Sequence, residues 1–125
     1  MIARTHRFHG YNSLNWAYRR GQAVRDSKIA LKYAINSKRS SYRAAVVVSR
    51  KVSKSAVVRN RIRRRIYEVI RECEPQIKDS YDLIFSVYSD SIAELPYSEL
   101  KQLIVNQLRQ AQVVEVDQDH QQARP

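Results

Sequence analysis

The clearest structural pattern in the chain lies in residues 55–73, SAVVRNRIRRRIYEVIREC. Apolar residues recur there every three or four positions, which is the spacing of one face of an α-helix. The residues on this face are Val58, Ile62, Ile66, Val69 and Cys73. Ser53 or Ser55 can cap the start of the helix, and Pro75 helps to end it. The pattern therefore predicts an amphipathic helix that packs one face onto the rest of the protein.

The remaining surface of this predicted helix is strongly basic. Six arginines and no lysine fall between positions 59 and 71. At about 100° per residue, one flank carries Arg59 and Arg63, the other carries Arg61 and Arg65, and Asn60 and Arg64 point away from the core. The planar guanidinium group can bind two phosphate oxygens at once, so this helix is a candidate polyanion-binding surface.

The charge of the whole chain also favours a polyanionic partner. The 125 residues include 23 Lys and Arg against 12 Asp and Glu, which gives a net charge of +11. The excess lies in residues 1–72, with 19 basic residues and three acids, whereas residues 73–125 have a net charge of −5. Eight basic residues and no acid fall between positions 50 and 65. This density favours polyanion binding over an ordinary solvated surface.

Length and composition bound the class of protein. The length allows one domain with one core. Cys73 is the one cysteine, which excludes an internal disulfide. The N-terminus lacks the apolar segment of a secretory signal, and no apolar run approaches the ~20 residues of a membrane-spanning helix. We therefore expect a soluble cytoplasmic protein with no membrane partner.

The segments around the basic helix predict three strands. Apolar residues alternate over 28–35, and an Ala/Val run over 43–49 indicates a second, buried strand. The polar segment 36–41 between them predicts that these two strands are antiparallel neighbours. A third strand is expected over 81–88, where Leu83, Phe85 and Val87 share one side.

Further helices are expected at both ends of the domain. A short helix over 13–20 precedes Gly21, and a last helix begins at Pro96 and presents apolar residues as far as Ala111. The predicted fold class is α+β, in the order α-β-β-α-β-α, with a small central sheet of about three to four strands covered by helices. We expect a single RNA-binding domain over residues 1–111 and a polar, disordered tail over residues 112–125.

Two motifs resemble the bacterial ribonuclease P protein subunit. Residues 49–52, SRKV, are similar to the end of a strand in that family, and residues 56–64, AVVRNRIRR, are similar to its Arg-Asn-Arg helix. Matching flanks are Arg7-Phe8, Tyr18-Arg19-Arg20-Gly21, Tyr33, Asp82 and the segment 96–100, PYSEL. The resemblance covers about residues 5–111. Arg65 departs from the pattern because an apolar residue is usual there, and Tyr67 stands where an arginine is usual.

The resemblance implies a fold and an activity. The fold is one that the family shares with a domain of a small-subunit ribosomal protein, and it contains a left-handed β-α-β crossover. The implied activity is that of ribonuclease P, an endoribonuclease in which a catalytic RNA removes the 5′ leader of precursor tRNA. The Mg²⁺ ions would be bound mainly by the RNA subunit and the substrate. The protein, one copy per RNA, would contribute no catalytic residue and no metal site, and DNA would not be a partner.

The resemblance also assigns two sets of site residues. The set that would contact the RNA subunit is Arg50, Lys51, Arg59, Asn60, Arg61, Arg63 and Arg64. The set that would line a cleft for the leader, between the first helix and the sheet, is Leu14, Tyr18, Leu31 and Tyr33. Unpaired bases stack on tyrosine rings, which is the contact expected of the aromatic members of this set.

Two other functions remain open from the residues alone. A self-sufficient nuclease would need clustered carboxylates, and the basic half offers Asp26, Glu68 and Glu72. His6 and His9 have a spacing that could share a metal, although a surface pair is the simpler interpretation. A ribosomal or other structured-RNA-binding protein, with no role in cleavage, would have a similar composition and a similar small fold.

Overall fold

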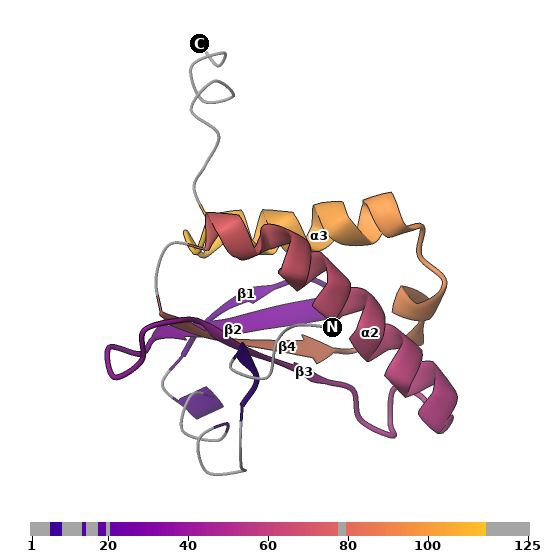
Figure 1. Cartoon of the computed structure of the whole chain (residues 1–125). Coiled ribbons are helices and arrows are strands. Elements are labelled where there is room, and N and C mark those ends of the chain that lie inside the picture. Colours follow the sequence, from indigo (N-terminus) through magenta and orange to yellow (C-terminus); the bar gives the residue numbers. More distant parts are fainter. Residues whose placement is uncertain (1–5, 9–13, 15–17, 20, 78–79, 115–125) are drawn as a thin grey trace.

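The computed structural model describes residues 6–8, 14, 18–19, 21–77 and 80–114. Within these residues the main elements are four strands and two long helices (Figure 1). The strands are β1 (Gln22–Arg25), β2 (Ile29–Ile35), β3 (Arg43–Val47) and β4 (Tyr81–Val87). The helices are α2 (Ala56–Cys73) and α3 (Tyr97–Gln110), with 3-10 turns η2 (Glu74–Gln76) and η3 (Asp90–Ala93). The fold is α+β, as the sequence predicts, and β1 is a strand that it does not predict.

The four strands form one sheet in the order β1-β2-β4-β3. β4 is antiparallel to β2 and parallel to β3. The predicted pairing of strands 28–35 and 43–49 is therefore wrong, because β4 lies between them. Burial explains this order: Leu83, Ile84 and Phe85 are at most 1% exposed, so both faces of β4 are covered and the strand takes a central place.

Helix α2 connects the parallel neighbours β3 and β4, and it covers the same face of the sheet as α3 (Figure 1). Viewed with these helices in front of the sheet, the crossover from β3 through α2 to β4 is left-handed. This hand is rare in β-α-β units, and it is the one that the family resemblance implies. We call the face under α2 and α3 the helix face and the other side the open face.

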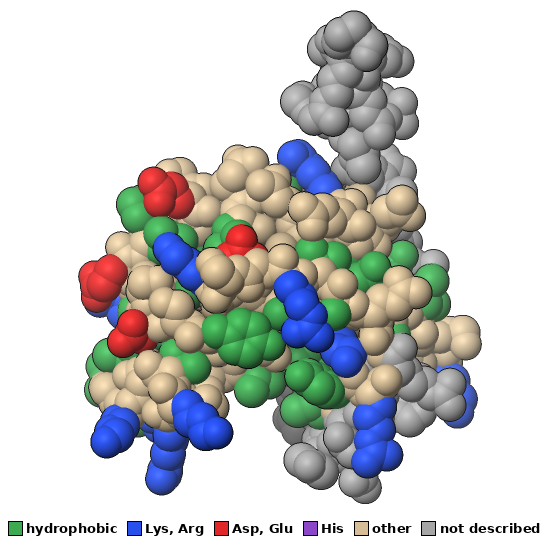
Figure 2. Space-filling view, turned by 180° about the vertical axis from the view of Figure 1, so that it is seen from behind, with side chains coloured by type: hydrophobic (Ala, Val, Ile, Leu, Met, Phe, Trp, Pro, Cys, Tyr) green, Lys and Arg blue, Asp and Glu red, His purple; other side chains and the backbone are tan. Residues whose placement is uncertain are grey.

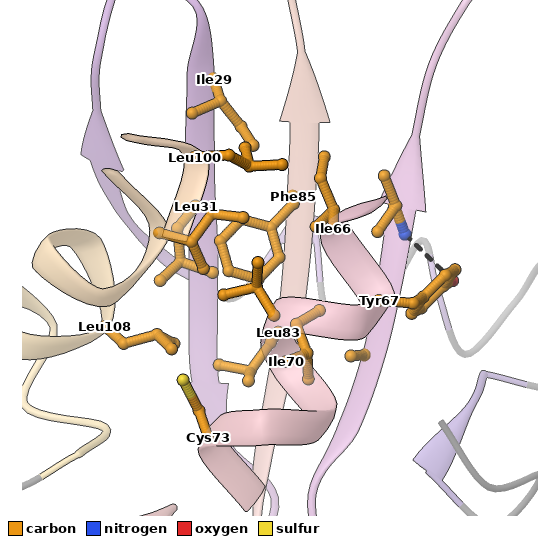
Figure 3. Packing of buried hydrophobic residues seen from close by; sticks show 14 of the residues in the cluster. Ile29, Leu31, Ile66, Tyr67, Ile70, Cys73, Leu83, Phe85, Leu100 and Leu108 are labelled. Carbon is orange, nitrogen blue, oxygen red and sulfur yellow. Dashed lines mark hydrogen bonds between the residues drawn. The ribbon is translucent and has the colours of Figure 1, made fainter. Parts of the chain in front are cut away.

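The core lies between the sheet and the two helices (Figure 3). Leu31 and Phe85 project from the sheet toward Ile66 of α2, and all three side chains are fully buried. Tyr67 lies at the edge of this cluster, where its hydroxyl accepts a hydrogen bond of 3.3 Å from the backbone N–H of Val46. Burial raises the pKa of Tyr67 above its ordinary value. Tyr67 is thus a core residue, which accounts for its position among arginines in the sequence.

The ends of α2 follow the sequence signals. Ser55 is the N-cap, and its hydroxyl accepts a hydrogen bond of 3.3 Å from the backbone N–H of Val58. At the other end, η2 carries Pro75 and the chain leaves the helix. The predicted helix and its apolar face are confirmed, and Ser55 rather than Ser53 is the cap.

A buried ion pair joins β3 to β4. Arg43 donates two hydrogen bonds of 2.9 Å to the carboxylate of Asp82, and Asn36 donates a third at 3.1 Å. All three residues are at most 8% exposed. The ring of Phe8 covers the Arg43 guanidinium group at 4.3 Å. This network fixes the polar turn after β2 to the centre of the sheet.

The packed part of the chain continues beyond α3. Val113 and Val114 are buried, and Val114 forms a β-bridge with Ile77. Gln112 takes a positive φ of 61°, which reverses the chain after the helix. These residues lie past position 111, where the sequence predicts the end of the domain. Residues 115–125 lie outside the described residues.

Candidate nucleic-acid interface

The outer side of α2 presents the predicted RNA-contacting residues. Asn60, Arg61 and Arg64 are exposed, and Arg59 and Arg63 lie half-buried on one flank. Ile62 and Ile66 are fully buried on the opposite side, so the helix is held by its apolar face. The predicted helical arrangement of charge is therefore confirmed.

Two of the arginines are fixed by neutral partners. The guanidinium group of Arg59 donates to the carbonyl of Ser53 at 2.8 Å. That of Arg63 donates to the side chain of Asn60 at 2.8 Å and to the carbonyl of Val48 at 3.4 Å. These contacts use some of the five N–H donors of each arginine and leave the charge unneutralised. The side chains are thereby oriented at a lower entropic cost for a later phosphate contact.

Among the described residues, two acidic side chains lie near these arginines. Glu68 lines one hollow with Arg61 and Arg64, and it accepts a hydrogen bond from Arg71. Glu94 lies 3.9 Å from Arg61, and both side chains are more than half exposed. An exposed pair at this distance stabilises little and competes weakly with a phosphate. Within the part of the chain that the structure describes, the cationic surface is therefore accessible, with Glu94 and Glu68 as acidic neighbours.

Arg65 has a different role from its neighbours. Its guanidinium group donates to the backbone carbonyls of Ile92 and Leu95, in and just after η3. It therefore fastens α2 to the segment that leads into α3. No local sequence signal reveals this contact, because the two carbonyls come from a turn about thirty residues away.

The loop before α2 extends the basic surface. Arg50 and Lys51 are exposed there, in a turn closed by a hydrogen bond of 3.1 Å from Val52 N–H to the Ser49 carbonyl. The loop leads into the N-terminus of α2, where unpaired N–H groups and the helix dipole also favour anions. We use the term basic surface for Arg50, Lys51, Arg59, Asn60, Arg61, Arg63 and Arg64. The structure thus brings together all seven residues that the sequence predicts for this site.

The open face of the sheet carries a second, shallow cleft. Tyr18 is 45% exposed, and the Lys32 ammonium group lies 4.6 Å from the centre of its ring. Arg25, Ala30 and Tyr88 line the same cleft, and Tyr88 is 52% exposed. Figure 2 shows this side of the molecule, with Lys and Arg side chains around exposed hydrophobic ones. Exposed aromatic rings beside cations are suited to an unpaired, negatively charged strand.

Two of the predicted leader contacts direct their side chains to the helix face. The Leu31 side chain is fully buried in the core, although the residue borders the open-face cleft, so its role in leader binding stays a prediction. Side chains alternate between the two faces of a strand, so Tyr33, two residues after Leu31, also lies on the helix face. Its hydroxyl donates a hydrogen bond of 3.1 Å to the Gln22 side chain. Strand alternation instead places Ala30 and Lys32 on the open face, and sequence reasoning missed Lys32 and Tyr88. Leu14 is half-buried, and most of the predicted helix around it lies outside the described residues.

The acidic residues of the basic half have structural partners. Asp26 accepts a hydrogen bond of 3.0 Å from the Lys28 N–H in the turn after β1, and Arg71 donates to Glu68 at 3.1 Å. Glu72 accepts from the Tyr97 hydroxyl and from Lys101, and these two contacts hold the pKa of Glu72 below its ordinary value. They join α2 to α3.

The other sequence-based candidates concern metals and membranes. Within the described part of the chain, no three His, Cys, Asp or Glu side chains are grouped to hold a metal ion. The His6 ring stacks on Tyr42, and its Nδ1 lies 2.9 Å from the Tyr42 carbonyl, whereas His9 lies outside the described residues. Neither α2 nor α3, the long helices of the described residues, has the apolar length to span a bilayer.

Sequence comparison relates the chain to a known protein family. The family model described as Ribonuclease P matches residues 2–112. The ribonuclease P protein component of Roseiflexus castenholzii is 34% identical over 97 residues, which are 78% of this chain and 79% of the relative. That of Synechocystis is 32% identical over 105 residues, covering 82% of this chain and 85% of the relative.

Structure comparison gives the same relationship at the level of the fold. The RNase P protein of Staphylococcus aureus matches with a TM-score of 0.77 and 21% identity, over 88% of this chain and 98% of that one. The protein from Thermotoga maritima matches with a TM-score of 0.69 and 18% identity, over 78% and 89% of the two chains. Together with the sequence matches and the exposed Arg-Asn-Arg helix, these findings show that the chain belongs to the ribonuclease P protein family.

Proposed function

We propose that this chain is the RNA-binding subunit of a ribonuclease P holoenzyme that removes the 5′ leader from precursor tRNA. The basic surface binds the catalytic RNA, and the open-face cleft binds the single-stranded leader. The observation that carries this proposal is the accessible arginine surface of α2, which is pre-oriented by neutral partners and little neutralised by carboxylates.

The proposal assigns the cleavage chemistry to the RNA. The protein surface next to the RNA is cationic, which repels Mg²⁺ and attracts phosphates. The RNA subunit and the substrate, rather than residues of this chain, would therefore hold the Mg²⁺, which would supply activation of water and stabilisation of the leaving oxygen. The protein neutralises phosphates, so the two RNAs can approach each other at a lower Mg²⁺ concentration.

The proposed leader contacts follow from the open face. The Tyr18 ring offers a stacking surface for a base, and Lys32 and Arg25 can bind phosphates beside it. Tyr88 lies on the same face and is exposed enough to take a second base. Mature tRNA has no leader, so the cleft would bind only the precursor.

Reconstitution tests the proposed function. We expect the purified protein to restore cleavage of precursor tRNA by the cognate ribonuclease P RNA at a low Mg²⁺ concentration. Protein without this RNA should cleave nothing, and RNA without protein should cleave slowly under the same conditions. Cleavage by the protein alone would contradict the proposal, as would co-purification with ribosomal subunits without any stimulation.

Substitution of Tyr18 tests the cleft. The Tyr18→Ala variant should bind precursor tRNA about tenfold less tightly in the holoenzyme, because one base loses its stacking partner. Its affinity for mature tRNA should not change. The matched variant Tyr18→Phe keeps the ring and should retain most of the binding. Equal losses for precursor and mature tRNA would show that the cleft does not bind the leader.

A further inference from the structure

A second hollow lies on the helix face, outside both surfaces described above. It has a volume of about 780 Å³ and lies between the end of β2, the start of β4 and the residues just after α3. Its lining includes Gln22, Tyr33, Ile35, Lys38, Gln110 and Gln112. Ile35 is 57% exposed, although it is a large apolar residue in a strand. We call this hollow the edge pocket.

The edge pocket and the open-face cleft are neighbours across one strand. Gln22 of β1 lines the edge pocket, whereas the next residue, Ala23, lines the cleft. Their partners on β2 are Tyr33 and Lys32, which also lie on opposite faces. Since β1 is the outer strand of the sheet, an extended chain in the cleft can pass around this edge into the pocket.

The chemistry of the edge pocket fits an unpaired nucleotide. The Gln22 carbonyl oxygen accepts a hydrogen bond from Tyr33, which leaves the amide N–H₂ of Gln22 as a donor. The exposed amides of Gln110 and Gln112 add donors and acceptors suited to base edges. Ile35 and the rings of Tyr33 and Tyr81 provide apolar surface for a base, and the described lining residues include no acidic side chain.

Lys38, in the turn after β2, supplies the positive charge of the pocket. Lys38 is exposed, and its backbone N–H donates to the Asn36 side chain at 3.2 Å. Asn36 is itself buried and bonded to Asp82 at the centre of the sheet. The position of Lys38 is therefore set by the folded core, and its ammonium group can reach a phosphate that enters the pocket.

We propose that the edge pocket binds nucleotides of the precursor leader that lie beyond the open-face cleft, after the leader turns around β1. This inference rests on the proposed function, because it needs a leader in the cleft. Precursor tRNAs whose leaders are long enough to pass β1 should therefore bind the holoenzyme more tightly than precursors with shorter leaders. A protein partner would use the same pocket without any dependence on leader length.

The test uses the holoenzyme and precursors whose leaders are shortened one nucleotide at a time. The pocket variant is Lys38→Ala, Gln110→Ala and Gln112→Gly, which removes three exposed side chains and leaves the core intact. Glycine is chosen at position 112 because it adopts the positive φ of this residue without strain. The matched control is Gln102→Ala with Asn106→Ala, two exposed amides of α3 away from the pocket.

We expect the affinity of the wild-type holoenzyme for precursor tRNA to rise in two steps as the leader lengthens. The first step reflects the open-face cleft and the second the edge pocket, so the pocket variant should lose the second step. The loss should be about three- to tenfold for long leaders, the size expected for one or two lost hydrogen bonds. Short leaders should bind the variant and the control as they bind the wild type. A thiouridine placed at the end of a long leader should crosslink to the edge pocket.

Two results would overturn the inference. One is a loss of affinity that is equal for every leader length, and the other is no loss at any length. Either result leaves the proposed function standing if the first step, which depends on Tyr18, is still present. If wild type shows no dependence on the leader at all, the proposed function has failed as well.

Discussion

The Asp82→Ala variant should unfold at a much lower urea concentration than the wild type. The Asp82 carboxylate is 1% exposed and accepts two hydrogen bonds from Arg43 and one from Asn36. Its removal leaves the buried Arg43 cation without a counter-charge, which typically lowers the free energy of unfolding by about 3–5 kcal/mol. For a domain of this size, the loss is a large part of the total stability.

Two further variants test whether the instability of Asp82→Ala comes from the unpaired charge of Arg43. Replacing both partners by apolar residues, with Arg43→Met and Asp82→Leu, should restore much of the stability, because no unpaired charge remains. Asp26→Ala, which removes an exposed carboxylate from a turn, should change stability by less than the Asp82 variant. If Asp82→Ala lowered the free energy of unfolding by no more than Asp26→Ala, the buried network would have no special importance for the fold.

The Arg61→Ala/Arg64→Ala variant should bind the ribonuclease P RNA about 10- to 100-fold less tightly at moderate salt. Both side chains are exposed on the outer side of α2, so their removal leaves the apolar face of the helix unchanged. The slope of log K against log salt should become shallower by about two units, because two phosphate contacts are lost. Filter binding over a range of salt concentrations measures both quantities.

The matched control removes two charges from elsewhere on the helices. Arg71→Ala/Lys101→Ala changes the net charge by the same amount, but these side chains pair with Glu68 and Glu72. This control should keep the wild-type salt slope. If both double variants lost affinity equally, binding would depend on net charge alone, and the basic surface would not be a specific site.

The helix α2 illustrates what could be predicted from the sequence. Its cap, its apolar face and its exposed arginines depend on residues within a few turns of one another, and all three predictions are confirmed. The role of Arg65 could not be predicted, because its carbonyl partners come from the segment around η3. Local periodicity identifies which residues share a face, and tertiary structure determines what that face contacts.

The sheet also shows that a local sequence pattern does not determine tertiary arrangement. Alternation along β2 correctly groups Leu31 with Ile29, and both are fully buried. The same alternation predicts a core position for the Leu31 side chain, whereas the family resemblance assigns Leu31 to the leader cleft, which the residue borders. The order of strands was also beyond local reasoning, because β4 comes much later in the chain than the two strands that it separates.

The most direct test of the central claim is the salt dependence of wild-type binding to the cognate ribonuclease P RNA. If the basic surface neutralises six to eight phosphates, log K should fall with log salt at a slope of roughly −4 to −7. A slope close to zero would mean that few phosphates are contacted. In that case the exposed arginines of α2 would not be the surface that holds this protein on its RNA.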